Sequence, residues 1–355
     1  MPTKSNRRST TSTTAQYSDM VRSFKIVSTV ALVVGIVAIA IGVTALVYSI
    51  GRPPPSNTII IENSTHSTTT VNQAGPGSNL AGINQPLNAT QLSIINNASS
   101  AYFEQAALML LNGSIKNQIS DSAPYVIKPV TPFKYGNKTT VVYLGSITCI
   151  FCGENRWAMA LALSRFGNFT SLYTGYSSLG DGDVPTIYWL PDTVNSSNDV
   201  LGNHYASNQV DFVAIEDTNP ISGGFQLNSL STIQANIQKA NSTEYKSALN
   251  YIINLSNNKT TAFSGTPYTV WGNHLFLGAD ASDFGNTTSS VNGYPEMSYM
   301  SHAQIFDQLA NPNDQFAWTE YAAADIYIVS LCDSTGNAAP VCKLGGIKLL
   351  EAEGV

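Results

Sequence analysis

The chain has 355 residues, which is long enough for one large domain or two ordinary domains with a full-sized core. Charged residues make up 11% of the sequence, against roughly 25% in an average soluble protein, so uncharged polar groups or attached sugars must provide solubility. The formal net charge of −6 offers no basic face for phosphate groups, which argues against a nucleic-acid-binding protein.

A membrane anchor is predicted near the N-terminus. Residues 1–25 are polar and rich in Lys and Arg, whereas residues 26–50 carry no charge and are long enough to cross a bilayer. Basic residues stay preferentially on the cytoplasmic side of a membrane. We therefore expect a cytoplasmic tail over residues 1–25, one transmembrane helix over 26–50 in the lipid bilayer of the cell membrane, and an extracellular remainder.

A cleaved signal peptide is the alternative interpretation of this segment. The apolar part of a signal peptide spans about 7–15 residues and precedes a cleavage site made of small residues. The segment here is longer and ends in Val47-Tyr48-Ser49-Ile50 without such a site. An uncleaved anchor is therefore preferred, followed by a linker rich in Pro, Ser, Thr and Asn over residues 51–86 and a folded domain over 87–355.

Sugar attachment is predicted on the exterior of the protein. The sequence holds an excess of Asn-X-Ser/Thr sequons, which are acceptors of N-linked sugar. The candidate asparagines are Asn63, Asn88, Asn97, Asn112, Asn137, Asn168, Asn195, Asn241, Asn254, Asn258 and Asn286.

The folded domain is expected to open with a helix and a strand. Apolar residues at helical spacing predict an amphipathic helix that begins at Asn88 and ends at Gly113. A Pro-rich passage then leads to residues 141–144, which predict a short apolar strand.

A helix that begins with two cysteines follows this strand. Cys149 and Cys152 precede a run that we expect to end at Gly167, and its segment 157–163 has almost no polar face. We therefore expect this helix to be packed on most sides.

The position of the two cysteines suits thiol–disulfide exchange. A thiol at the first turn of a helix faces unpaired N–H groups and the positive end of the helix dipole, which favour the thiolate. We expect Cys149, outside the first turn, to be exposed and Cys152, inside it, to be shielded. A structural disulfide is the alternative outside a cell. Glu154 and Arg156, further along the helix, are expected to be solvated or to form a salt link.

Strands and helices alternate in the next part of the chain. Strands are predicted over residues 171–176, 186–190 and 210–216, and residues 230–255 predict a pair of helices or one interrupted helix. The loop at residues 180–183 contains two Asp residues, but their spacing fits no EF-hand calcium loop and a solvated turn is expected.

A β-hairpin is predicted over residues 263–278. The chain enters it through Thr266-Pro267 and turns at Gly272-Asn273. Because proline cannot donate to a strand ladder, Pro267 is expected at an edge or at a position that uses its ring geometry. His274 in the returning strand is expected to have a structural role.

The chain ends with two predicted helices and a second cysteine pair. The helices cover residues 301–309 and 316–330, and Cys332 and Cys342 follow them. No helix N-terminus activates this pair, so we expect a structural disulfide. A zinc site that uses all four cysteines is the alternative, but the spacing and the extracellular location argue against it. No metal or other cofactor is expected.

These features resemble a known fold and a known family. The Cys-X-X-Cys motif between a strand and a helix, followed by Gly265-Thr266-Pro267 and a hairpin, is similar to the thioredoxin fold. The anchor, the motif with Arg156-Trp157 and residues 162–167 after it, and the trailing cysteine pair resemble an archaeal membrane-anchored family, domain of unknown function 929. The resemblance implies an α/β fold, a thioredoxin-like domain with insertions and extra helices preceded by one transmembrane helix.

The resemblance also implies a site and a function. It makes Cys149 the attacking thiol, Cys152 the resolving thiol and Pro267 a cis-proline beside them. The expected function is that of a membrane-anchored extracellular thiol–disulfide oxidoreductase, with protein thiols or disulfides as substrate and an unidentified redox partner. The alternative is a non-catalytic cell-surface glycoprotein with a thioredoxin-like binding module and structural disulfides.

Overall fold

The structure is a computed structural model that describes residues 82–114, 125–147, 149–177, 184–189, 201–202, 204–216, 218–221, 224–227, 230–255, 267–277, 297, 300–313 and 315–354. The expected cytoplasmic tail, the expected transmembrane helix and the loop at 180–183 lie outside these residues, as do the sequons at Asn63, Asn195, Asn258 and Asn286. Within the ranges given, no helix is both long enough and apolar enough to span a membrane.

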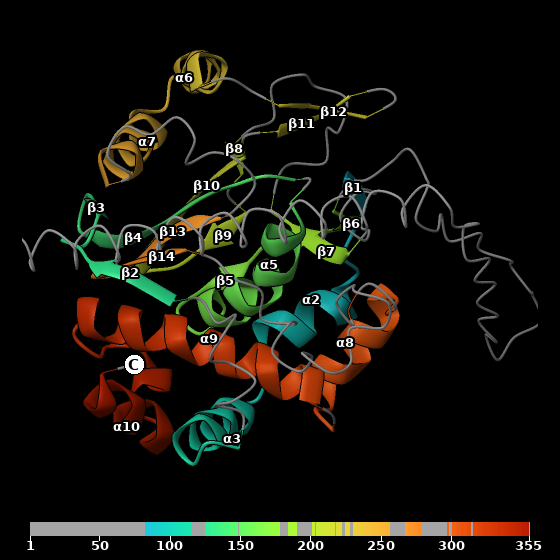
Figure 1. The fold of residues 1–355 in the computed structure, drawn as a ribbon, viewed down its shortest axis with the longest axis vertical. Helices are drawn as coiled ribbons and strands as arrows, with labels where there is room; N and C mark the ends of the chain where they lie inside the picture. Colours follow the sequence, from blue (N-terminus) through green and yellow to red (C-terminus); the bar gives the residue numbers. More distant parts are fainter. Residues whose placement is uncertain are drawn as a thin grey trace, which may run out of the picture. The chain divides into compact units, whose positions relative to one another are not determined.

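A seven-stranded mixed sheet forms the centre of the described fold (Figure 1). In β4 and β10, which are parallel, Val210 lies opposite Thr139 and Glu216 lies opposite Gly145. The neighbours on the other side of β4 are antiparallel. The strand order is β2 (Tyr125–Pro129), β14 (His274–Leu277), β13 (Tyr268–Trp271), β4 (Lys138–Gly145), β10 (Val210–Glu216) and β8 (Leu201–Gly202), and β3 (Lys134–Tyr135) also pairs with β4.

Helices and three smaller sheets complete the described part. The helices are α2 (Ala89–Asn96), α3 (Ser100–Leu111), α5 (Ile150–Leu163), α6 (Leu230–Lys239), α7 (Thr243–Leu255), α8 (His302–Ala310), α9 (Gln315–Ser334), α10 (Gly345–Glu353) and the 3₁₀-helix η5 (Pro340–Lys343). The smaller sheets are β1 (Gly82–Pro86) with β6 (Tyr173–Tyr176) and β7 (Pro185–Tyr188), β5 (Asn168–Phe169) with β9 (Tyr205–Ala206), and β11 (Thr218–Ile221) with β12 (Gly224–Leu227).

Both faces of β4 are buried. Val141 and Tyr143 belong to a large apolar cluster that includes residues of α5 and α9. Val142 and Leu144 point to the opposite face, into a second cluster with residues of α6 and α7. A strand that is covered on both faces reads as a continuous apolar run rather than as an alternating one, which explains the sequence of this strand.

The helix that begins at the two cysteines is buried as the sequence predicts. Every residue from Trp157 to Leu163 in α5 is inaccessible to solvent. The end of the helix differs from the expectation, because α5 stops at Leu163 with Ser164 as its C-cap rather than at Gly167. A Cβ atom on Gly167 would lie 2.5 Å from the carbonyl oxygen of Ala206, so this glycine permits the close approach of β9.

The expected single helix between Asn88 and Gly113 is wrong. The chain forms α2 and α3 instead, separated by residues 97–99. The backbone N–H of Asn97 closes α2 on the carbonyl oxygen of Ser93 at 2.8 Å, and the side chain of Ser99 accepts the N–H of Ala101 at 3.3 Å. Capping groups thus end one helix and begin the next although the apolar period continues.

The start of the folded part also differs from the expectation. Residues 82–86, which the sequence assigned to the linker, form β1 and pair with β6. The folded part therefore begins before residue 87. The other strands and helices predicted within the described residues are confirmed, with α6 and α7 as a pair of helices rather than one.

Cys332 and Cys342 form a disulfide, as expected, which joins the last turn of α9 to η5. Replacing both cysteines by serine should lower the free energy of unfolding by about 2–3 kcal/mol, because the cross-link restricts the unfolded chain. Denaturant unfolding of the full-length protein measures this loss. Treatment of the wild-type protein with a reductant should produce the same loss, and an unchanged unfolding midpoint in the double variant would contradict the prediction.

Asp325 is a fully buried acid in α9. Neither of its carboxylate oxygens has a hydrogen-bond partner in the described part of the chain. Burial, and secondarily the charge of Glu104, raises the pKa of Asp325 well above its ordinary value. The folded state therefore favours the protonated acid. This contribution to stability is complete below the unfolded pKa of about 3.9 and is lost as the pH rises through the folded pKa.

The variant Asp325→Asn removes this titration. We expect it to unfold at a higher temperature than the wild-type protein at pH 7 and to lose that advantage near pH 3, below the unfolded pKa of about 3.9. Thermal unfolding at a series of pH values measures the difference. Asp307→Asn, which removes an exposed carboxylate from α8, is the matched control and should follow the wild-type curve. Equal destabilisation by Asp325→Asn at every pH would refute this account.

Candidate dithiol site

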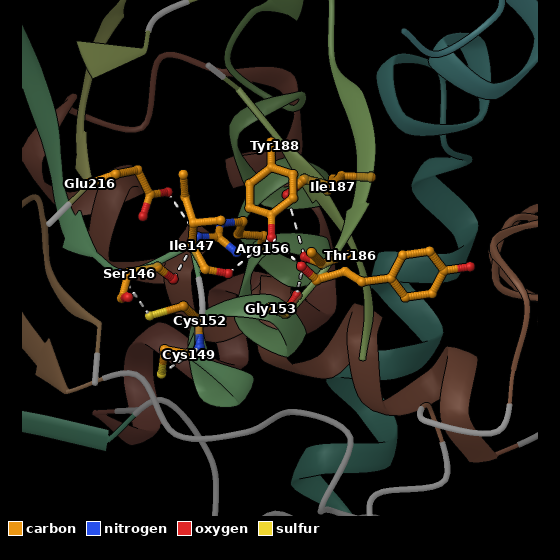
Figure 2. Close-up of polar contacts among 11 residues, drawn as sticks. Ser146, Ile147, Cys149, Cys152, Gly153, Arg156, Thr186, Ile187, Tyr188 and Glu216 are labelled. Carbon is orange, nitrogen blue, oxygen red and sulfur yellow. Dashed lines mark hydrogen bonds and ion pairs between the residues drawn. The ribbon is translucent and has the colours of Figure 1, made fainter. Parts of the chain in front are cut away.

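The two cysteines of the Cys-X-X-Cys motif lie at the N-terminus of α5, after the turn that follows β4 (Figure 2). Cys149 is the N-cap residue, and its Sγ accepts a hydrogen bond from the backbone N–H of Cys152 at 3.4 Å. The Sγ of Cys152 accepts a hydrogen bond from the backbone N–H of Ser146 at 3.3 Å. No disulfide joins the two sulfurs in this structure.

The expectation that Cys149 is exposed is wrong. Cys149 is 5% exposed and Cys152 is 0% exposed, so the order is as expected but both thiols are buried. The first turn of α5 packs against β7, where the Oγ1 of Thr186 donates to the carbonyl oxygen of Gly153 at 2.5 Å. Phe151, between the cysteines, is 40% exposed. Contact of a large molecule with the Sγ of Cys149 therefore requires local movement around it.

A buried ion pair lies behind the dithiol. Arg156 and Glu216 are both inaccessible to solvent, and the Nη2 of Arg156 lies 2.8 Å from the Oε1 of Glu216. The same Nη2 donates to the carbonyl oxygen of Ser146 at 3.0 Å. Arg156 stands one turn after Cys152 on α5, and Glu216 is the last residue of β10. The ion pair therefore connects the helix, the strand and the turn that leads to Cys149, as Figure 2 shows.

Aromatic rings surround the guanidinium group. The Cζ of Arg156 lies 4.4 Å from the ring centroid of Tyr188, and 5.7 Å from those of Tyr143 and Trp189. The hydroxyl of Tyr188 donates to the carbonyl oxygen of Ile147 at 2.9 Å, which fixes the ring against the turn. A cation held over an aromatic face in a dry site is stabilised by the ring quadrupole.

Burial controls the ionisation of this cluster. It raises the pKa of the Cys152 thiol well above its ordinary value, and the positive charge of Arg156 opposes that shift. Burial also raises the pKa of Glu216, and Arg156 again opposes the shift by favouring the carboxylate. The pKa of Tyr143 is raised by burial as well. Cys152 is therefore a protonated thiol at neutral pH.

Pro267 lies at the same edge of the sheet as the dithiol. It is buried and immediately precedes β13, whose first residue, Tyr268, pairs with Leu144 of β4. Pro267 therefore stands beside the end of β4 from which the chain enters the turn to Cys149. The peptide bond before it joins Thr266, which lies outside the described residues, so the cis form of that bond stays a prediction.

The other residues noted in the sequence have different surroundings. Glu154 is buried rather than solvated, and the expected salt link of Arg156 exists but lies in the core. His274 lies at the opposite end of β13 from Pro267, in the pair that closes the hairpin, and its Nδ1 is 2.9 Å from the Oγ of Ser330. Within the described ranges, no group of three or more His, Cys, Asp or Glu side chains is arranged to hold a metal ion.

Three members of the cluster were not singled out from the sequence. Glu216 and Tyr143 come from the paired strands β10 and β4, whereas Tyr188 comes from β7 of a separate sheet, and only tertiary packing brings all three to Arg156. The one available signal was the acidic residue at the end of the otherwise apolar run 212–216.

These observations define a mixed α/β protein with a dithiol at the start of a buried helix and an ion pair behind it. The chain belongs to the family described as Domain of unknown function (DUF929), whose sequence profile matches residues 125–332. That range contains the dithiol, Pro267 and both members of the ion pair. No protein with curated annotation and no solved structure matches the chain.

Proposed function

We propose that this protein is a membrane-anchored extracellular thiol–disulfide oxidoreductase that acts through Cys149 and Cys152. The observation that carries the proposal is the pair of cysteines at the N-terminus of α5, which are not joined by a disulfide. The helix dipole and the main-chain N–H groups at such a position favour a thiolate, which is the attacking species in exchange. The second cysteine pair lacks this environment and is bonded as a disulfide.

The proposed domain is thioredoxin-like, with insertions and extra helices. Two features of the sheet support this assignment: the parallel strands β4 and β10, with α5 directly after β4, and the antiparallel hairpin of β13 and β14 beside β4. The position of Pro267 at the dithiol edge supports it further. In this proposal the small sheet of β5 with β9 is an insertion, and α2, α3 and α10 are additional helices.

The proposed reaction proceeds in two exchanges. The thiolate of Cys149 attacks one sulfur of a substrate disulfide, and the other substrate sulfur leaves as a thiolate and takes up a proton. The Cys152 thiol then loses its proton and attacks the Sγ of Cys149. The second substrate sulfur leaves as a thiol. The substrate disulfide has then been reduced by two electrons, and Cys149 and Cys152 have been oxidised to a disulfide. The reverse sequence oxidises a substrate dithiol.

An exchange assay separates this function from a non-catalytic surface glycoprotein. We expect the full-length protein to catalyse the reduction of insulin disulfides by dithiothreitol, and Cys149→Ala and Cys152→Ala to fall to the uncatalysed rate. The double variant Cys332→Ala/Cys342→Ala is the matched control and should stay active, because that pair lies outside the site. Absence of catalysis by the wild-type protein, or equal loss in the control, would favour the binding module with structural disulfides.

The proposed location is the outer face of the cell membrane. The support is the basic tail over residues 1–25, the uncharged segment over 26–50 and the sequons. The sequon asparagines among the described residues are all exposed, so sugar on them would meet no obstacle from the fold. They are Asn88, Asn97, Asn112, Asn137, Asn168, Asn241 and Asn254.

Cell fractionation and glycopeptide mapping test this location. We expect the full-length chain in the membrane fraction and sugar on exposed sequons, because sugar is attached outside the cytoplasm. Deletion of residues 26–50 should release the chain from the membrane. Recovery of the intact chain in the soluble fraction, with no sugar on any sequon, would be incompatible with the proposed location.

A further inference from the structure

We propose that Arg156 is a positioning residue for the second exchange, because it holds the Ser146 backbone so that its N–H donates to Cys152, and places a positive charge beside that thiol. This inference rests on the proposed exchange activity. It assigns a role to the buried ion pair, which the proposed function does not use.

The contacts form a short chain that ends at the resolving sulfur. The Nη2 of Arg156 donates to the carbonyl oxygen of Ser146 at 3.0 Å, and the N–H of Ser146 donates to the Sγ of Cys152 at 3.3 Å. Ser146 lies in the turn between β4 and α5, and its carbonyl oxygen also accepts the backbone N–H of Cys149 at 3.3 Å, so the turn joins Arg156 to both cysteines. The guanidinium therefore fixes the orientation of the residue that supplies the hydrogen bond to Cys152 (Figure 2).

The guanidinium is itself held in one place and in one charge state. Glu216 at 2.8 Å and the ring of Tyr188 at 4.4 Å stabilise the cation in a site without access to solvent. The two charges act on Cys152 in opposite directions: Arg156 favours the thiolate, Glu216 disfavours it, and the effect of Arg156 is the larger.

The two tyrosines that face Cys152 stay neutral between pH 6 and pH 9. Burial raises the pKa of both tyrosines that face it above that range. The groups that act on Cys152 from the packed elements are Tyr143 of β4, Glu216 of β10, Tyr327 of α9, and Cys149 and Arg156 of α5.

The proposed role concerns one proton and one bond. In the mixed disulfide, the Cys152 Sγ must give its proton to solvent before it attacks the Sγ of Cys149. The new bond joins the two cysteines, and the bond from Cys149 to the substrate sulfur breaks with its electron pair on the substrate. Because burial holds Cys152 in the thiol form, the cost of removing that proton limits this step, and Arg156 reduces the cost.

A structural ion pair and a positioning residue predict different results for its two members. If the pair only holds the fold together, Arg156→Gln and Glu216→Gln should shift the pH dependence of resolution by Cys152 in the same direction. If Arg156 favours the Cys152 thiolate against Glu216, the two substitutions should shift the pH dependence of resolution in opposite directions.

The test uses the full-length protein and 5,5′-dithiobis(2-nitrobenzoate). Attack by Cys149 releases one thionitrobenzoate and leaves the other bound as a mixed disulfide, and attack by Cys152 releases the second. The rate of the second release, followed by stopped-flow absorbance between pH 6 and pH 10, gives the apparent pKa of resolution. We expect Arg156→Gln to raise this pKa by about one unit, so that the second release slows about tenfold at pH 7, and Glu216→Gln to lower it.

Two further variants keep the result interpretable. Arg156→Lys retains the charge but lacks the fork of donors, and should raise the apparent pKa less than Arg156→Gln. Should Arg156→Gln fail to fold, the comparison of Arg156→Lys with Glu216→Gln decides in its place. Arg165→Gln is the matched control, since Arg165 is a partly buried arginine after the end of α5 that donates to the carbonyl oxygen of Ala98 at 2.5 Å, and it should leave the second release unchanged.

The outcomes separate this inference from the proposed function. Shifts of the same sign in Arg156→Gln and Glu216→Gln, or no shift in either, overturn the role of Arg156. If the wild-type protein releases no second thionitrobenzoate after the first, the proposed exchange itself fails.

Discussion

The buried ion pair between Arg156 and Glu216 is the constraint on which the arrangement of the dithiol depends. Two charges removed from water are tolerated only when each compensates the other, and loss of one partner of such a pair costs about 3–5 kcal/mol. Here the pair joins α5 to β10, and Arg156 also holds the carbonyl group of Ser146. One guanidinium thus fixes two core elements and the turn that leads to Cys149 relative to each other.

The elements with a strong local pattern were predictable from the sequence. The strand at residues 141–144, the buried segment 157–163 of α5 and the hairpin with its turn at Gly272-Asn273 follow from apolar runs, helical periodicity and turn residues, and all three are confirmed. The break between α2 and α3 was missed, because the apolar period continues through residues 97–99 while the capping side chains there determine where each helix ends.

The surroundings of the dithiol were not predictable in the same way. Arg156 and Glu216 are separated by 60 positions in the chain, and only the parallel pairing of β10 with β4 brings them together. The contact between β7 and the first turn of α5, in which the Oγ1 of Thr186 donates to the carbonyl oxygen of Gly153, was likewise not indicated by any local pattern. Local spacing indicated the dithiol and its helix, but not the charge placed behind it.

The N-cap residue of α5 is a cysteine, and its sulfur takes part in the hydrogen bonding of the helix start. At most helix starts an oxygen of Ser, Thr, Asp or Asn receives the first unbonded N–H group, whereas here the Sγ of Cys149 receives that of Cys152. Because sulfur is a weaker hydrogen-bond acceptor than oxygen, the first turn of α5 is held less firmly at its cap than the start of a helix that Ser or Asp caps.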